Sequence, residues 1–416
     1  MNSAGERRVV VTGLGVVAPN GTGVDAFWQA SLQGVSGIAS PQRFAVDELP
    51  IQVVGEVPDF QAEAHLPRKF VQRTDRVTHF ASVAVAEALR DARLDFTQEE
   101  PGRVGAVIAN TLGGVEFVLE QIEALYTKGP RAMSAYTAIA WLQVASVGQV
   151  SLRHSLQGYC KTPVNDTAGG LEALALATRA IRRGVADVLI TGGSEALLHP
   201  YFLLLLGHSD ICVSGCDPRA YRPFDRRANG LILAEGAGIC ILEEYEHARR
   251  RQAPIYGEIL GSGSTNDARG HCSPTSDGVH YARAMRLALQ DAQLQPTEID
   301  YFSLDGRAHP EADRAEVAAL REVFGAYLDE LPVSVPRTMN GHSYAAAGAL
   351  DTIAALLALR SQQIPPTLNC EQPAFGAQLD LVCEQARPFM GTTALIGARG
   401  ISGTNLVLAV RQGEHL

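Results

Sequence analysis

The sequence predicts an α/β fold made of two similar halves. Three short apolar runs in the first half, residues 104–108, 159–164 and 187–191, are typical of buried strands, and helical patterns lie between them. A second alternating series of strands and helices begins near residue 255. This alternation favours a largely parallel sheet with helices on both faces. With 416 residues and 46% hydrophobic content, the chain can bury a large core.

The first strand is predicted over residues 8–12, and the run Gly13-Leu14-Gly15 follows it. This run nominally matches a dinucleotide-binding loop. We discount that match because Pro19 and Gly21 fall where the phosphate-binding helix should already be running. A glycine-rich loop after a core strand is the simpler interpretation. Two helices are expected next, one that contains Phe27 and Trp28 and one over residues 78–92.

A further helix is predicted after Gly113 and Gly114. Val115, Val118 and Ile122 fall at positions i, i+3 and i+7 of it, so they share one face. From the pattern alone, this face is an ordinary core face.

The most informative stretch is a tight turn at Thr167. The strand at 159–164 leads into it, and a helix with Leu171, Leu174 and Ile181 on one face follows it. A strand, a turn and a helix in this order place a nucleophile at a helix N-terminus, where unpaired N–H groups and the helix dipole favour negative charge. A threonine without an adjacent base is, however, a poor nucleophile. The turn indicates either an enzyme that uses threonine or one that has lost its nucleophile.

The second half is expected to repeat the rhythm of the first. Because no Pro- or Ser-rich linker separates them, we expect the halves, residues 1–250 and 251–416, to form one inseparable body. The remaining elements are predicted as strand 239–242, helix 243–251, strand 255–260, helix 280–292, strand 300–304, helix 311–323, strand 332–334, helix 346–361, a strand near 380, and hairpin strands 393–397 and 405–410.

Composition excludes several classes of protein. The net charge is −10 and no long Lys/Arg run occurs, so we expect no nucleic-acid partner. Seven scattered cysteines favour a reducing, cytoplasmic location. We expect no signal peptide, and no apolar run approaches the roughly 18 residues that a membrane span needs. His208, Cys212 and Cys216 have a spacing that a metal could use, but no fourth ligand is evident and we predict no metal site.

Polar side chains cluster in loops after the strands of the second half, where a site is expected. The 400–405 turn could also offer backbone N–H groups to an anion. The loop residues are Asp305, Arg307, His309, Asp313, Glu316, Arg337, His342 and Ser343.

Motifs in the same order along the whole chain resemble β-ketoacyl synthases of fatty-acid and type II polyketide synthesis. The resemblance implies the thiolase fold, a five-layer αβαβα body made of two βαβαβαββ halves, and a dimer. The motifs are Val9 to Gly21 with Phe27-Trp28, Arg222-Pro223-Phe224-Asp225, Ala234-Glu235-Gly236-Ala237-Gly238, Gly341-His342-Ser343, Pro365-Pro366-Thr367-Leu368-Asn369 and Gly403-Thr404-Asn405.

That family uses one cysteine and two histidines. Gly170 matches the glycine three places after the family's cysteine, so the nucleophile position is Thr167. The first histidine position is Asp305, and the second histidine is retained as His342. The resemblance therefore implies that the nucleophile and one histidine are lost together.

The remaining family positions are structural in this comparison. Arg337 replaces the family's lysine, and Asp313 and Glu316 keep its acidic companions. Ile401 takes the place of the gating phenylalanine, and Asn405 closes the Gly-Thr-Asn motif.

The double loss resembles one branch, the chain-length factors or ketosynthase β subunits of type II polyketide synthases. Residues 113–117, 168–174 and 305–316 look like that branch. The resemblance implies a heterodimer with a cysteine-bearing ketosynthase α subunit, substrates on the phosphopantetheine arm of an acyl carrier protein, and no cofactor of its own. It also implies that Val115, Val118 and Ile122 line the tunnel for the growing chain, and the small valines favour a medium-to-long product. Two departures are Thr167, where the branch often has glutamine, and His342, which the branch often loses.

Three functions remain open. The chain could be a non-condensing partner subunit, a decarboxylase that acts on malonyl-carrier protein through Asp305 and His342, or a self-sufficient enzyme that uses Thr167. For the first, Thr167 is expected to fill a vacated site, with its hydroxyl bonded locally. Asp305 is then expected to be held by backbone N–H groups or by Arg307, and His342 to be a relic or to orient a carboxylate.

Overall fold

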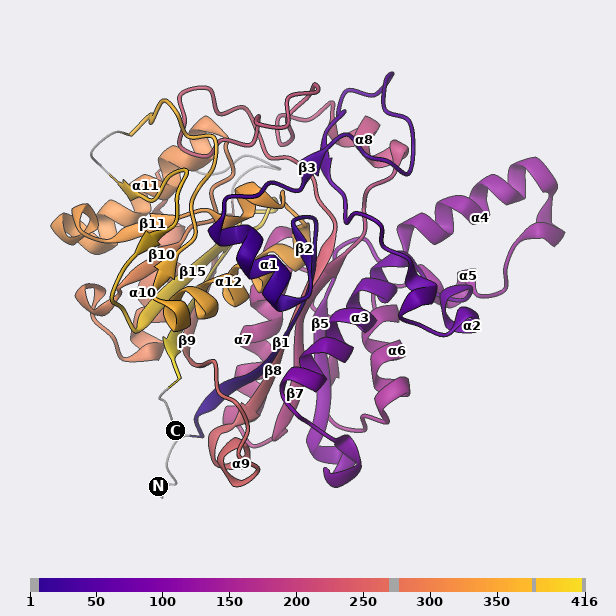
Figure 1. Ribbon diagram of the computed structural model, residues 1–416, viewed down its shortest axis with the longest axis horizontal. Helices are drawn as coiled ribbons and strands as arrows, with labels where there is room; N and C mark the ends of the chain where they lie inside the picture. The colour runs from indigo at the N-terminus through magenta and orange to yellow at the C-terminus, as the bar shows by residue number, and fades with distance from the viewer. Residues whose placement is uncertain (1–6, 269–276, 376–378, 414–416) are drawn as a thin grey trace.

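The structure is a computed structural model that describes residues 7–268, 277–375 and 379–413 (Figure 1). Among these residues, twelve strands form one mixed sheet. Eleven of them lie side by side in the order β13-β11-β10-β15-β16-β9-β1-β8-β7-β5-β6, and β2 pairs with β1. The strands are β1 (Val9–Ala18), β2 (Gly21–Thr22), β5 (Val104–Ala109), β6 (Cys160–Lys161), β7 (Val188–Glu195), β8 (Gly236–Glu244), β9 (Gly257–Asn266), β10 (Tyr301–Ser303), β11 (Pro332–Ser334), β13 (Asp380–Leu381), β15 (Thr393–Arg399) and β16 (Thr404–Gln412).

Four short strands form two small antiparallel pairs, and helices account for much of the rest. The pairs are β3 (Ile38–Ala39) with β4 (Val54–Gly55), and β12 (Gln363–Ile364) with β14 (Arg387–Pro388). The helices are α1 (Val24–Leu32), α2 (Arg68–Val71), α3 (Arg76–Asp91), α4 (Val115–Lys128), α5 (Thr137–Ala140), α6 (Ala145–His154), α7 (Gly169–Arg182), α8 (Pro200–Leu206), α9 (Tyr245–Arg250), α10 (Val279–Ala292), α11 (Pro310–Phe324) and α12 (Ala347–Ser361).

The strand order is symmetric about the centre of the sheet. One half reads β1-β8-β7-β5-β6 outward, and the other reads β9-β16-β15-β10-β11 outward. The first strand of each series therefore meets its counterpart, and the two pair antiparallel through Val10 with Glu258 and Val11 with Gly257. This confirms the two similar halves; their division at residue 250 stays a prediction.

Strand directions differ from the prediction of a largely parallel sheet. Parallel pairs occur only toward the two ends, between β6, β5 and β7 and between β13, β11, β10 and β15. Every adjacent pair among the central strands β7, β8, β1, β9, β16 and β15 is antiparallel. The prediction was wrong here because strands buried on both faces show the same continuous apolar pattern in either direction.

Strand β1 also corrects the glycine-rich loop that was predicted after residue 12. It continues to Ala18, straight through Gly13 and Gly15. A Cβ on Gly13 would lie 2.3 Å from the Ala88 carbonyl oxygen, and one on Gly15 would lie 1.9 Å from the Ala84 oxygen. The glycines therefore let α3 pack directly on the strand. The strand predicted at 159–164 is shorter than expected, since only β6 pairs.

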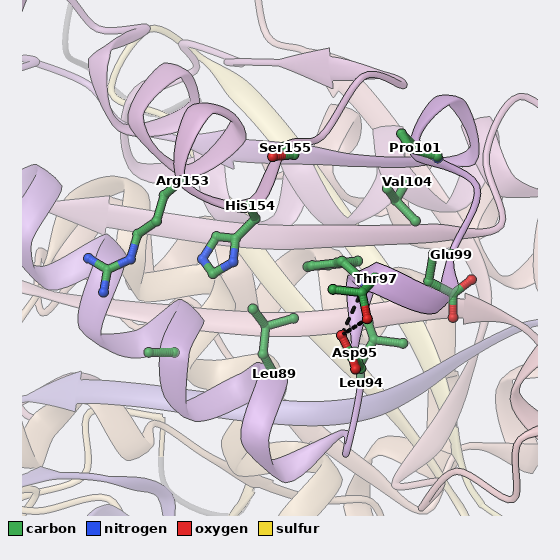
Figure 2. Close-up of a pocket in the computed structure, with 12 residues that line it drawn as sticks. Leu89, Leu94, Asp95, Thr97, Glu99, Pro101, Val104, Arg153, His154 and Ser155 are labelled. Atoms are coloured by element: carbon green, nitrogen blue, oxygen red, sulfur yellow. Dashed lines mark hydrogen bonds between the residues drawn. The ribbon is translucent and has the colours of Figure 1, made fainter.

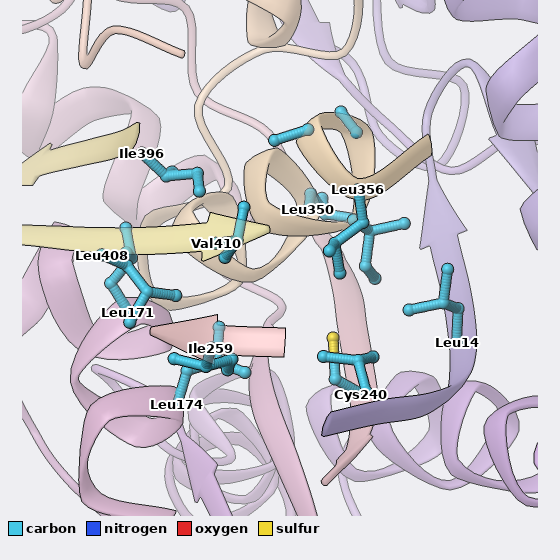
Figure 3. Packing of buried hydrophobic residues seen from close by; sticks show 14 of the residues in the cluster. Leu14, Leu171, Leu174, Cys240, Ile259, Leu350, Leu356, Ile396, Leu408 and Val410 are labelled. Carbon is cyan, nitrogen blue, oxygen red and sulfur yellow. The ribbon is translucent and has the colours of Figure 1, made fainter. Parts of the chain in front are cut away.

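The molecule has five layers, in which the two halves of the sheet alternate with three layers of helices. This confirms the αβαβα body. Helices α3 and α6 cover the outer face of the first half, and α10 and α11 cover the outer face of the second. Helices α7 and α12 lie between the halves and contact strands of both. The main core lies there, where Leu171 and Leu174 of α7 face Leu350 of α12 and the strands around them (Figure 3).

Helix α4 is the exception to this packing. It extends away from the body, and the chain returns through α5 (Figure 1). None of its fourteen residues, all of which the structure describes, is buried. Val115 and Val118 are half-buried, and Ile122 is 42% exposed. The helix is confirmed, but its apolar face is not a core face of this chain.

Candidate functional site

The turn that carries Thr167 is a short 3₁₀ segment, Asp166–Ala168, that continues into α7. Its close approach to the 3₁₀ turn before α12 depends on a glycine. A Cβ on Gly170 would lie 2.5 Å from the Ala345 carbonyl oxygen, so any larger residue would push the helix start away. Gly170 therefore fixes the position of Thr167, which is 1% exposed.

Asp166 ties this turn to the loop between β15 and β16. Its backbone has a positive φ of 34°, and its carboxylate accepts the Ile401 N–H at 2.8 Å and the Ser402 N–H at 3.2 Å. The 400–405 turn thus donates to an anion, as its sequence suggested, but the anion belongs to the protein. Half-buried Ile401 lies beside this contact, and Asn405 anchors the base of the loop by donating to Asp267 at 2.7 Å.

The Thr167 hydroxyl is held by local groups. It lies in hydrogen-bond contact with the Arg399 carbonyl oxygen and 2.9 Å from Asp166 Oδ1. A carbonyl can only accept, so we assign the hydroxyl hydrogen to it. Asp166 already accepts three backbone N–H groups, including that of Thr167, and competes weakly for this hydrogen. The geometry supplies no free base for Thr167.

Asp305 lies at the centre of a cluster of guanidinium groups. Its Oδ2 accepts from Arg307 Nε at 3.0 Å and from Arg399 Nε at 3.0 Å, and its Oδ1 lies 3.2 Å from Arg337 Nη1. Burial alone would raise the pKa of Asp305, but the three guanidinium groups together hold it well below the usual value. Asp305 is therefore an ionised counter-ion rather than a general base.

Glu316 bonds to the backbone beside Asp305 and to Arg399, and it belongs to the same cluster, which we call the buried ion network. It accepts the backbone N–H groups of Asp305 at 2.9 Å and Gly306 at 3.0 Å, and Arg399 Nη2 lies 3.1 Å from its Oε2. The network consists of Asp305, Arg307, Asp313, Glu316, Arg337, His342, Asp351 and Arg399.

His342 is fully buried and bonded to a cation. Its Nε2 lies 2.9 Å from Arg337 Nη1. Burial and the neighbouring arginine move the pKa of His342 well below its ordinary value, so the ring is neutral. Both ring nitrogens face a donor, because the Tyr344 N–H points at Nδ1 from 3.2 Å, and a neutral ring has one lone-pair nitrogen. We assign the lone pair to Nε2, which makes the shorter contact and faces a charged guanidinium that can only donate. His342 thus cannot donate from Nε2 to a substrate oxygen in this arrangement.

Asp313 accepts the Phe224 N–H at 2.7 Å through Oδ2. Its Oδ1 has no hydrogen-bond partner among the described residues. Burial, opposed by the Phe224 N–H, raises the pKa of Asp313 to about 7. It is the least compensated carboxyl of the buried ion network.

Two members of the network were missed from the sequence. Arg399 lies at the end of β15, whose sequence predicted an apolar strand. Its burial is explained by its contacts with Asp305 and Glu316, which are distant in the sequence. Asp351 binds Arg337 Nε at 3.0 Å. The signal for Asp351 was present, since a lone carboxylate in the otherwise apolar helix over residues 347–361 requires a buried cation.

The structure brings Thr167, Asp305, Arg337 and His342 together through their contacts with one another and with Arg307, whose Nη2 lies 3.4 Å from Thr167 Oγ1. Val115, Val118 and Ile122 lie apart from them on the extended α4. Among the described ranges, no group of three or more His, Cys, Asp or Glu side chains is placed to hold a metal.

A separate concave surface lies over the outer helical layer (Figure 2). It has a volume of about 790 Å³ and lies between the C-terminal ends of α3 and α6, at Leu89 and His154. None of the residues predicted for the site lines it.

Comparison with known proteins assigns the fold and its motifs to one family. Residues 6–248 match the β-ketoacyl synthase N-terminal domain, and residues 256–371 match the C-terminal domain. The chain belongs to the β-ketoacyl synthase family. The matched ranges contain the Thr167 turn and the second-half loops that carry Asp305 and His342.

Curated relatives of this ketosynthase-family chain cover almost its full length. It is 43% identical over 407 residues to the tetracenomycin polyketide synthase ketoacyl synthase beta subunit of Streptomyces glaucescens, with 97% of this chain and 98% of that protein covered. It is 35% identical to 3-oxoacyl-[acyl-carrier-protein] synthase 2 of Coxiella burnetii, with 97% and 98% covered.

Solved structures agree with this family assignment. A type II polyketide synthase acyl-carrier protein in complex with its ketosynthase bound to the hexaketide matches with a TM-score of 0.90 and 31% identity, covering 99% of this chain and 100% of that one. The ishigamide ketosynthase/chain length factor matches with a TM-score of 0.90 and 29% identity, covering 98% and 100%. No helix of the described residues is long and apolar enough to cross a membrane.

Proposed function

We propose that this chain is a non-condensing chain-length-factor subunit of a type II polyketide synthase. It pairs with a cysteine-bearing ketosynthase α subunit and helps to shape the tunnel that holds the chain growing on an acyl carrier protein. The observation that carries the proposal is the state of the Thr167 region: the nucleophile position and the retained histidine are both fully engaged inside the protein.

Condensation needs a nucleophile and donors aimed at a substrate oxygen. The Thr167 hydroxyl donates to the Arg399 carbonyl, and His342 Nε2 accepts from Arg337. Asp305 is held ionised among three guanidinium groups. These contacts favour a subunit that stabilises the assembly over one that makes bonds itself.

The extended arm favours the proposal of a partner subunit. The arm comprises α4, α5 and the residues between and after them, 115–144. Six of its large apolar side chains are exposed, a pattern that marks an interaction surface. They are Ile122 at 42%, Tyr126 at 84%, Tyr136 at 39%, Ile139 at 54%, Trp141 at 49% and Val144 at 51% exposed.

Two of the compared proteins support the kind of partner. One relative is named as a ketoacyl synthase beta subunit, and one solved structure is a ketosynthase/chain length factor. A third matches from a complex that contains an acyl-carrier protein, which fits substrates carried on a phosphopantetheine arm.

Intact-mass measurement tests the absence of condensing chemistry. The purified chain is mixed with malonyl- and acyl-loaded carrier protein, with and without a cysteine-bearing ketosynthase from the same organism. We expect acyl transfer to the ketosynthase alone. An acyl adduct on this chain at Thr167 would overturn the proposal in favour of a self-sufficient enzyme. Carbon dioxide release by this chain alone would favour the decarboxylase instead.

Substitutions on α4 test the tunnel. Val115, Val118 and Ile122 share a face that would meet the partner, and Val118→Phe should narrow the space on that face and shorten the product by at least one two-carbon unit. Glu123→Phe on another face of the same helix serves as the matched control and should leave product length unchanged. Product masses of the reconstituted synthase decide it: an unchanged length for Val118→Phe would remove these residues from the tunnel.

A further inference from the structure

The first turns of α3 and α4 share one side-chain cap. Asp75 precedes α3, and its Oδ1 accepts the Val77 N–H at 2.8 Å, which is the ordinary N-cap bond of that helix. Its Oδ2 accepts the Phe117 N–H at 2.7 Å, and Phe117 lies in the first turn of α4. One carboxylate therefore satisfies an unpaired N–H group at the start of two different helices.

Helix α4 has no cap of its own. The residue before it is Gly114, which has no side chain that could accept a hydrogen bond. The same glycine lets the helix start approach α3, because a Cβ on Gly114 would lie 2.8 Å from the Cβ of Asp75. The start of α4 is thus built to receive its cap from Asp75.

This cap matters more to α4 than to α3. Helix α3 has a buried face that includes Val77, Phe80 and Ala84, whereas no residue of α4 is buried. A hollow of about 370 Å³ lies between the start of α3 and α4, with Asp75, Phe117 and Glu120 among the residues that line it. A helix of this length without a buried face is marginally stable in water, so hydrogen bonds at its ends contribute much of its order.

The Asp75 carboxylate also depends on the two helices. It is 2% exposed, and no arginine or lysine of the described residues forms an ion pair with it. Burial raises the pKa of Asp75 to about 7, although the Val77 and Phe117 N–H groups oppose this rise. The charge is stabilised by N–H groups at two helix N-termini, where the helix dipole favours an anion. Movement of α4 away from α3 would leave one oxygen of a buried carboxylate without its partner.

We propose that Asp75 is the positioning residue of α4 and that it fixes where Val115 and Val118 lie relative to the body of the subunit. This rests on the proposed function, in which these valines line the tunnel, and it makes Asp75 a determinant of how uniform the product length is. A second tie to the body is the ion pair between Arg43 and Glu116 at 2.7 Å. That pair is partly exposed and contributes less than the buried cap.

Hydrogen–deuterium exchange of the isolated full-length chain tests the attachment. At pH 8 Asp75 is ionised. Asp75→Ser keeps one oxygen for the Val77 N–H but has none for Phe117. Peptides within residues 115–128 should exchange about fivefold faster than in the wild type, as the loss of one cap predicts. Peptides within residues 77–91 should stay within about twofold of the wild type, because serine is also a good N-cap.

Two further variants keep this test decisive. Asp75→Asn has nearly the wild-type shape but one acceptor oxygen for two N–H groups, and its oxygen should stay with Val77 because α3 is packed in the body. It should therefore also accelerate exchange in residues 115–128. Asp95→Ser changes another N-cap aspartate, which accepts the Thr97 N–H at 3.0 Å, and should leave both regions unchanged. Unchanged exchange in residues 115–128, or equal acceleration in α3 and α4, would overturn the proposal.

Product masses from the reconstituted synthase test the consequence for function. The chain is combined with a cysteine-bearing ketosynthase and malonyl-loaded carrier protein. With Asp75→Ser, the share of product outside the main length should rise about threefold, because a site held loosely by its supporting residues loses precision. Asp95→Ser should give the wild-type distribution. A lower yield with an unchanged distribution would show a role in stability alone and would overturn the positioning role.

Val118→Phe separates this proposal from the proposed function. If that variant changes product length and Asp75→Ser does not, the positioning role fails while the tunnel stands. If neither changes product length, the tunnel assignment fails, and the exchange rates of the isolated chain still decide whether Asp75 holds α4.

Discussion

The buried ion network and the extended arm handle unfavourable groups in opposite ways. The network buries charged side chains and pairs most of them with partners from a distant part of the chain, as Asp305 does with Arg399. The arm leaves large apolar side chains exposed on the surface of this chain. The difference teaches that the contacts around Thr167 and Asp305 are made within this chain, whereas the helix predicted to line the tunnel has a face that this chain does not cover.

Substitution of Arg337 tests the buried ion network and should cause the largest loss of stability. Arg337→Met leaves Asp305 and Asp351 buried without their shared cation, and removal of one partner of a buried pair costs about 3–5 kcal/mol. Denaturant unfolding measures the loss. Arg286→Ala removes an exposed pair with Glu322 and should cost less than about 0.5 kcal/mol. Equal losses would show that burial is not what sets the value of Arg337.

The pH dependence of stability at Asp313 is a second test of the buried ion network. The pKa of Asp313 is raised from 3.8 to about 7, so the folded state holds the proton more tightly than the unfolded state does. The cost of ionising it is fully present above about pH 7 and disappears as pH falls toward 4. Asp313→Asn should therefore stabilise the protein at pH 8, by an amount on the order of 2–4 kcal/mol.

The measurement for Asp313→Asn is the difference in unfolding free energy between variant and wild type across pH 4 to 8. We expect that difference to grow with pH and to level off above 7. A flat difference would mean that Asp313 is compensated by groups that its contacts do not show.

Substitution in the extended arm tests the second region of this comparison, and its expected effect on free energy is smaller. Trp141→Ser removes an exposed apolar side chain, so the free energy of unfolding of the isolated chain should change by less than about 0.5 kcal/mol. Its affinity for the cysteine-bearing ketosynthase should fall at least tenfold, which is about 1.4 kcal/mol. Calorimetric titration measures the affinity. Should the isolated chain lose stability while binding is unchanged, the arm would be part of this chain's own fold.

The order of elements and the clustering of Thr167, Asp305 and His342 could be predicted from the sequence, because both follow from local patterns and motif order; that the cluster is the functional site stays a prediction. Periodicity located α7 and α12, and motif order located Thr167, Asp305 and His342. The partners of these residues could not be predicted. Arg399 lies 94 positions from Asp305 along the chain, and the neutral state of His342 follows from burial that only the folded protein creates. The exposure of α4 was missed for the same reason, since a helical face has the same pattern whether its neighbour is in the same chain or another.

Strand β1 lies at the centre of the sheet, yet it is synthesised well before both of the long strands that flank it. Its neighbours β8 and β9 are made only when the chain has reached residues 236–266. Until then, a ten-residue strand that is fully buried in the native protein is paired only at its last two residues, by β2. Such late, long-range pairing slows folding and exposes an apolar strand edge during synthesis. The symmetry that joins the two halves so closely therefore makes the first half depend on the second before its central strand is paired on both edges.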